Sequence, residues 1–239
     1  MAAWHLVVAA TGVPAYILPG PGAVARAWAA HWGTITTHAA HTLAEILLGL
    51  GIGAAGGAAT ALGMASSRAL RRWVLPALVV SQAVPVFALA PLLVLWFGYG
   101  MASKVLMATL IIYFPVTASF LDGLRRTNPG WIDLARTMDA SSRAILWHVR
   151  VPAALPSLAS GLRVAAAVAP IGAVIGEWVG SSTGLGYLML RANGRMQIDL
   201  MFAALGTLAL LGVALYFGVD RALRAMIPWA PGSRPAAAD

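Results

Sequence analysis

Long apolar stretches with almost no charge dominate this sequence of 239 residues. A helix needs about 20 apolar residues to cross the hydrocarbon core of a bilayer. Backbone polar groups in lipid must find partners within their own segment, so each stretch of that length is predicted to be a helix. The sequence therefore predicts an all-α fold, a polytopic membrane helix bundle that forms a single transmembrane domain over residues 1–239. The five clear spans are predicted at residues 42–64, 74–97, 105–124, 158–179 and 200–219.

The composition excludes several other classes of protein. Hydrophobic residues make up 60% of the chain and charged residues only 10%, whereas a soluble domain is about 25% charged. An ordinary soluble enzyme of this size could not cover its surface with so few charges. The chain has no cysteine, which excludes thiol catalysis and disulfides.

The basic residues predict the orientation of the chain. If the five spans alternate in direction, 12 of the 16 Lys and Arg residues fall on one side of the membrane. Loops rich in Arg and Lys stay in the cytoplasm, so this side and the C-terminus are predicted to be cytoplasmic. The basic excess then marks topology and gives no reason to expect a nucleic-acid partner. The twelve residues are Arg68, Arg71, Arg72, Arg125, Arg126, Arg136, Arg143, Arg150, Arg163, Arg221, Arg224 and Arg234.

The N-terminal segment and the first span each carry a further expectation. Residues 2–10 are apolar but end at Gly12 and Pro14, too early for a full span, so we expect the tail of a truncated or partial N-terminal helix. In the first span Gly49, Gly53 and Gly57 form two overlapping GxxxG steps. Small residues at this spacing let helices approach closely in lipid.

The chemistry of an energy source is missing from the chain. Its single lysine, Lys104, lacks the glycine-rich sequence of a phosphate-binding loop. His38 and His41 have only Glu45 nearby, so no metal site is predicted. Ionisable residues within the spans are few, and ion-coupled carriers depend on them. We therefore expect a chain that is not an enzyme, with no catalytic residue and no cofactor. An ion-coupled secondary carrier and a non-transport membrane scaffold remain the alternatives.

The segment between the third and fourth spans is amphipathic. Leu134, Met138, Ile145 and Val149 recur at helical spacing among arginines. Ser141 or Ser142 is placed to cap a second short helix. We expect a helix–turn–helix hairpin over residues 125–156 on the cytoplasmic face.

This hairpin segment resembles the ATPase-contacting loop of the permease subunits of bacterial ABC importers. The signature of that loop is E-A-A, three residues, Gly, nine residues and I-x-L-P. The chain keeps the spacing without a gap, but aspartate replaces both the glutamate and the glycine. Asp tolerates the left-handed turn that the glycine would make, so the turn is expected to be kept. The matching positions are Asp133, Ala135, Asp139, Val149, Val151 and Pro152.

Further motifs resemble the nitrate/sulfonate/taurine-type branch of that family, and they extend the likeness over about residues 12–225. The segment at 190–202 is most similar to permeases for a thiamine pyrimidine precursor of the hydroxymethylpyrimidine type. Members of that family usually have six spans, one more than the five clear spans predicted in this sequence. This agrees with a truncated or partial N-terminal helix. The motifs lie at residues 14–24, 84–92, 96–98, 176–180 and 184–187.

The resemblance implies the architecture and partners of a type I ABC importer permease. It implies a homodimer in a bacterial inner membrane, two copies of a separate ABC ATPase that bind the ATP, and an extracytoplasmic solute-binding protein. The cargo would be a small polar solute, either a thiamine pyrimidine precursor or a sulfonate, taurine or nitrate-like anion. The hairpin would then be a coupling hairpin seated on the ATPase. The residues expected to couple are Asp133, Ala135, Met138, Asp139, Ile145, Val149, Val151 and Pro152.

Polar residues in or near the spans are candidates for the translocation pathway or its gate. Each could instead satisfy helix backbone or a neighbouring helix. Glu177 and Trp178 could also form an outer gate or contact the binding protein. The candidates are Gln82, Tyr113, Thr117, Glu177 and Trp178.

Overall fold

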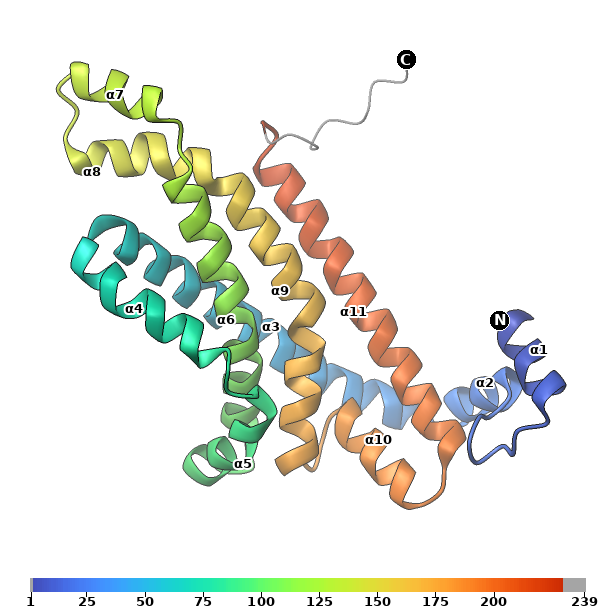
Figure 1. The fold of residues 1–239 in the computed structure, drawn as a ribbon. Helices are drawn as coiled ribbons and strands as arrows, with labels where there is room; N and C mark the ends of the chain where they lie inside the picture. Colours follow the sequence, from blue (N-terminus) through green and yellow to red (C-terminus); the bar gives the residue numbers. More distant parts are fainter. Residues whose placement is uncertain (1, 230–239) are drawn as a thin grey trace, which may run out of the picture. The chain divides into compact units, whose positions relative to one another are not determined.

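The structure, a computed structural model, describes residues 2–229 and is almost wholly helical over them (Figure 1). Strands are absent from residues 2–229, and Arg234 lies outside the described residues. The helices are α1 (Ala2–Thr11), α2 (Pro21–Ala30), α3 (Trp32–Ser66), α4 (Arg68–Ser81), α5 (Val86–Phe97), α6 (Met101–Arg125), α7 (Pro129–Thr137), α8 (Ser142–Ile145), the π-helix η1 (Leu146–Arg150), α9 (Val151–Gly180), α10 (Leu185–Gly194) and α11 (Ile198–Met226).

Four helices are long and apolar enough to cross a membrane. They are α3, α6, the continuous helix formed by α8, η1 and α9, and α11. The pair α4 and α5 provides a fifth span when it is counted as one interrupted helix. This confirms the predicted polytopic helix bundle, although every span is longer than its predicted apolar stretch.

The second predicted span, residues 74–97, is wrong as a single helix. Helix α4 ends at Ser81 and α5 begins at Val86. Pro85 has no N–H to donate and disfavours helical backbone in the residue before it. The amide of Gln82 therefore turns back to the carbonyl of Val79, 3.1 Å away, and the helix stops. The apolar residues on both sides of the break had favoured one continuous helix in the prediction.

The described residues form two compact units, and the division falls inside all four long helices. Unit 1 comprises residues 2–49, 87–108 and 170–214. Unit 2 comprises residues 50–86, 109–169 and the described part of the chain from 215 onwards. Each unit therefore has a core of its own.

The core of unit 1 lies between the beginning of α3, helix α10 and the beginning of α11. Ile35 is fully buried there against Leu185 and Ala204. Helices α6 and α9 also come very close in this unit, because a Cβ on Gly172 would lie 2.7 Å from the Cα of Ala108. Only a glycine permits that approach at this position.

The core of unit 2 lies between the end of α3, the end of α6 and the beginning of α9. Met64, Leu124 and Ala154 are fully buried in it. A Cβ on Gly53 would lie 2.7 Å from Ile112 Cγ2, and one on Gly57 would lie 3.0 Å from the carbonyl oxygen of Tyr113. The predicted role of the small residues in close helix packing is confirmed for these two glycines.

Candidate functional site

The segment between α6 and α9 folds into the predicted hairpin, formed by α7 and α8 at the ends of those two helices (Figure 1). The side chain of Asn128 caps α7 by accepting a hydrogen bond of 2.8 Å from the amide of Gly130. Pro129 occupies the first turn, where its missing N–H costs nothing. Helix α7 therefore begins with two strong local signals.

Helix α7 buries none of its residues. The exposed fraction is 55% for Trp131, 63% for Leu134 and 75% for Met138. Large apolar side chains gathered on one short helix are typical of a surface that another protein covers. Trp131, Leu134 and the C-cap residue Met138 together are called the α7 patch below.

The turn of the hairpin is the left-handed turn that the sequence predicts. Asp139 has a φ of 58°, and the amide of Ala140 donates to the carbonyl of Ala135 at 3.0 Å. Ser141 then caps α8 by accepting a hydrogen bond of 3.2 Å from the amide of Ala144. Aspartate thus makes the turn in which the loop signature has glycine.

The base of the hairpin is anchored to the core of unit 2. Leu146 is buried beside Met64 and Leu124. Arg150 lies in η1 and donates to the carbonyl of Leu124 from Nε at 3.1 Å and from Nη2 at 2.9 Å. It also donates to the carbonyl of Ala65 at 3.5 Å. These carbonyls end α6 and α3, where a basic side chain is favourable. Sequence reasoning treated Arg150 only as a topological marker.

The predicted coupling residues therefore fall into two groups. Asp133 and Asp139 are exposed with Met138, and Ala135 is half-buried beside them. Asp133 also forms an ion pair of 3.0 Å with Arg136 on the same helix. The second group lies at the base and is buried or partly buried, so it packs the hairpin onto the bundle. The second group comprises Ile145, Val149, Val151 and Pro152.

Three of the pathway candidates lie in unit 2, and their side chains form hydrogen bonds to residues of helices. Tyr113 donates from its hydroxyl to Thr60 at 2.7 Å, which links α6 to α3. Thr117 donates to the carbonyl of Tyr113 at 2.7 Å. Gln82 is exposed and donates to Ser81 at 3.4 Å. Such hydrogen bonds are expected if these residues serve the packing of the helices and do not line the translocation pathway.

Glu177 is the centre of a buried hydrogen-bond cluster in unit 1. Its side chain accepts from the hydroxyl of Thr42 at 2.6 Å and from the backbone amides of Gly186 and Tyr187. The amide of Leu185 donates in turn to Thr42 at 2.8 Å. Helix α10 is therefore fixed at its N-terminus to both α3 and α9. Trp178, the next residue, is 51% exposed.

Gly184 completes this cluster. Its φ of 105° is open only to glycine, and a Cβ there would collide with the carboxyl group of Glu177. Its amide donates to His38 Nδ1 at 2.9 Å. The histidine that the sequence offered as a weak metal candidate thus has a partner in the protein backbone.

A buried ion pair in unit 1 is the feature that sequence reasoning missed. Lys104 Nζ lies 3.5 Å from Glu45 Oε1, and the two side chains are 5% and 0% exposed. Lys104 lies just before the predicted third span at residues 105–124, but α6 begins at Met101 and carries it into the bundle. No hydrogen bond to either oxygen of Glu45 occurs among the described residues.

The fold and the hairpin define a class, the polytopic membrane proteins whose helix bundle carries a helical hairpin between two of its spans. The model of a family described as the inner membrane component of binding-protein-dependent transport systems matches residues 48–229. The chain belongs to this family. It is a permease of the ABC importer type and a multi-pass membrane protein, and the resemblance seen in the sequence is confirmed.

Relatives of known name agree with this assignment. The chain is 55% identical to a "Probable ABC transporter permease protein" of Haemophilus influenzae, over 94% of this chain and 91% of that one. It is 38% identical to the formylaminopyrimidine transport permease protein ThiX of Halalkalibacterium halodurans, over 96% and 92%. It is also 38% identical to the riboflavin transport system permease protein RibX of Chloroflexus aurantiacus, over 95% and 85%.

A solved structure supports the fold. A chain of the MetNI methionine ABC transporter, in an inward-facing conformation, matches with a TM-score of 0.67 and 21% identity. The match covers 77% of this chain and 92% of that chain. At this level of identity the likeness shows the shared type I importer architecture.

Proposed function

We propose that the chain forms the translocation pathway of an importer for a small polar solute and is driven by a separate ATPase that binds the ATP. The α7 patch carries this proposal, because membership of the family brings an ATPase partner and α7, in the hairpin between α6 and α9, leaves Trp131, Leu134 and its C-cap residue Met138 exposed. The chain itself would supply no ATP site and no catalytic residue. Two copies of the chain and two ATPases would form the complex, with an extracytoplasmic solute-binding protein.

The orientation follows from the same proposal. The hairpin would lie in the cytoplasm, together with the C-terminus and most of the basic residues, as the bias of Arg and Lys favours. Closure of the ATPases on ATP would move the hairpins. Because Leu146 and Arg150 anchor each hairpin to the ends of α3 and α6, this movement would reach the helix bundle.

A charged substitution in the α7 patch tests the docking. Met138→Asp places a carboxylate where the proposal has an apolar contact, and it should abolish the stimulation of ATP hydrolysis by loaded binding protein. Met226→Asp is the matched control, because Met226 is 71% exposed, close to the 75% of Met138, and lies at the end of α11. Coupled hydrolysis and uptake by Met138→Asp at the level of the control would refute the docking.

The proposed solute is a small aminopyrimidine of the thiamine-precursor class. The segment at 190–202 and the likeness to the formylaminopyrimidine permease support it, while an equally close likeness to the riboflavin permease makes riboflavin the second candidate. Importers of this kind select their solute at the binding protein. Calorimetry on the solute-binding protein that stimulates ATP hydrolysis by this complex, with formylaminopyrimidine, hydroxymethylpyrimidine, riboflavin and taurine, would decide between them.

Glu177 is proposed to position α10 and not to contact the solute. Its carboxylate is already occupied by Thr42 and two backbone amides. Glu177→Gln should therefore lower thermal stability while each folded complex transports at the normal rate. A loss of transport by folded complexes would favour the gate or pathway role instead.

A further inference from the structure

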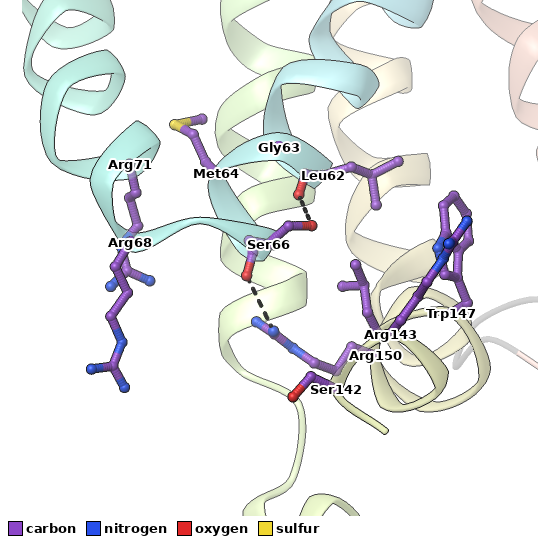
Figure 2. Close-up of a pocket in the computed structure, with 12 residues that line it drawn as sticks. Leu62, Gly63, Met64, Ser66, Arg68, Arg71, Ser142, Arg143, Trp147 and Arg150 are labelled. Atoms are coloured by element: carbon purple, nitrogen blue, oxygen red, sulfur yellow. Dashed lines mark hydrogen bonds between the residues drawn. The ribbon is translucent and has the colours of Figure 1, made fainter. Parts of the chain in front are cut away.

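A pocket of about 620 Å³ opens in unit 2 beside the base of the hairpin (Figure 2). The end of α3 and the beginning of α4 form one side of it, and α8 with η1 forms the other. Its volume falls within the range of about 300–1,000 Å³ that is usual for ligand pockets. The lining residues that matter below are Arg68, Arg71, Arg143, Arg150, Ser66 and Trp147.

The pocket concentrates positive charge without any balancing acid. Four arginines line it, and the ion pairs found in residues 2–229 include none of them. Arg150 uses its donors on the carbonyls that end α3 and α6. The side chains of Arg68, Arg71 and Arg143 have no hydrogen-bond partner within the part of the chain that the structure describes. Their donors are free for a ligand, and like charges this close favour an anion.

The kinds of side chain point to a phosphate group. A guanidinium presents a planar fork of N–H donors that matches the oxygens of a phosphate, and several arginines can bind one group from different directions. Arg68 and Arg71 line the pocket from α4, and Arg143 lines it from α8, on separate sides of it (Figure 2). Ser66 lies at the rim and donates from its hydroxyl to the carbonyl of Leu62 at 2.8 Å (Figure 2).

The remaining lining suits a lipid better than a free anion. Trp147 is 50% exposed, and an amphipathic indole of this kind is typical of the boundary between membrane and water. Leu62, which is partly buried, adds an apolar side chain from the spanning helix α3. A free phosphate would bind the arginines but leave Trp147 and Leu62 uncovered.

We infer that the pocket binds the phosphate of an anionic phospholipid from the cytoplasmic leaflet. The assignment to that leaflet rests on the orientation given under the proposed function. Basic pockets between spanning helices on the cytoplasmic side are suited to anionic headgroups. The bound headgroup would bridge α4 to the base of the hairpin and brace the element that the ATPase moves.

The test measures lipid bound to the intact complex. The transporter with its ATPase is placed in nanodiscs of phosphatidylcholine alone or mixed with phosphatidylglycerol, and native mass spectrometry counts the retained phosphatidylglycerol. Arg68→Gln/Arg71→Gln should bind it about 30-fold more weakly, the equivalent of about 2 kcal/mol for two basic residues. Arg68→Lys/Arg71→Lys keeps the charge and should retain most of the binding, which separates a loss of charge from a failure to fold.

Arg72→Gln/Arg221→Gln is the matched control. It removes the same charge from two exposed arginines that do not line the pocket, and it should bind lipid like the unaltered complex. Equal loss in both double variants would mean that general surface charge holds the lipid, and the pocket would be rejected. The lipid count does not depend on transport or on ATP hydrolysis, so failure of the proposed function would not change it.

Two further outcomes would overturn the inference by naming another occupant. Millimolar inorganic phosphate is added to complexes in phosphatidylcholine alone and to complexes in the mixture with phosphatidylglycerol, and equal phosphate binding in both would assign the pocket to a free anion. Dissociation of the ATPase from Arg68→Gln/Arg71→Gln, with unchanged lipid retention, would assign the arginines to an acidic surface of the ATPase.

Discussion

The hydroxyl of Thr42 donates a hydrogen bond to Glu177 at 2.6 Å and accepts one from the amide of Leu185 at 2.8 Å. One buried threonine therefore joins α3 to α9 and to the beginning of α10. The contact brings together residues that are distant in sequence, and it gives unit 1 a polar centre beside its apolar core.

Removing this hydroxyl should destabilise the protein. Thr42→Val removes the hydrogen bond to Glu177 Oε1 and leaves the amide of Leu185 without its partner, and a buried unsatisfied group costs about 1–3 kcal/mol. Thr42→Ser keeps the hydroxyl and should behave almost like the unaltered protein. Thermal unfolding in detergent compares the two, and equal midpoints would show that Thr42 contributes no net stability.

Gly184 should not tolerate a side chain. Gly184→Ala puts a Cβ against Glu177 at a backbone φ of 105°, so the cluster must open or the loop must move. We expect a severe loss of folded protein in membranes. Gly194→Ala is the control, since nothing lies within 4 Å of a Cβ at that position. The amount of monodisperse protein after detergent extraction is the measurement, and a normal yield for Gly184→Ala would contradict the geometry.

The ion pair between Lys104 and Glu45 should be costly to break from one side only. Lys104→Met leaves a buried carboxylate without its cation, and such a change costs about 3–5 kcal/mol. Lys104→Met/Glu45→Leu replaces both charges by apolar groups and should recover most of the stability. Thermal unfolding of the two variants checks this, because an unimproved double variant would show that Glu45 has another role.

The left-handed backbone of Asp139 makes a sharp prediction for the hairpin. Asp139→Gly should fold and couple normally, since glycine adopts a φ of 58° without strain. Asp139→Val should cost about 1–2 kcal/mol at the turn and reduce the stimulation of ATP hydrolysis by loaded binding protein. If valine couples as well as glycine, the turn does not position the α7 patch.

Local signals made much of this fold predictable from the sequence. Apolar periodicity located the hairpin, the loop signature located the turn at Asp139, and capping preference narrowed the cap of the second helix to Ser141 or Ser142, of which Ser141 is the one; each signal depends on residues within a few positions of one another. Pro85 was visible too, but the apolar run around it favoured a continuous helix, and the break at 82–85 was missed.

The contacts between helices could not be predicted from such local signals. The apolar periodicity of a spanning helix does not say which neighbour it faces, so the partners of Glu45 and Glu177 could not be derived. Lys104 was misplaced for a related reason. Hydropathy marks the apolar stretch, whereas the helix extends past it and carries a paired charge inside.

Arg150 has a mechanical consequence. One guanidinium holds the ends of α3 and α6 against the helical turn that leads into α9. If an ATPase moves the hairpin, as proposed above, these contacts would pass the movement to three membrane helices and not only to the two that the hairpin connects. A lysine here would offer one ammonium in place of a rigid fork, and the three helix ends would lose their common clamp. With this fork in place, the ends of α3 and α6 and the beginning of α9 share one side chain as their common contact.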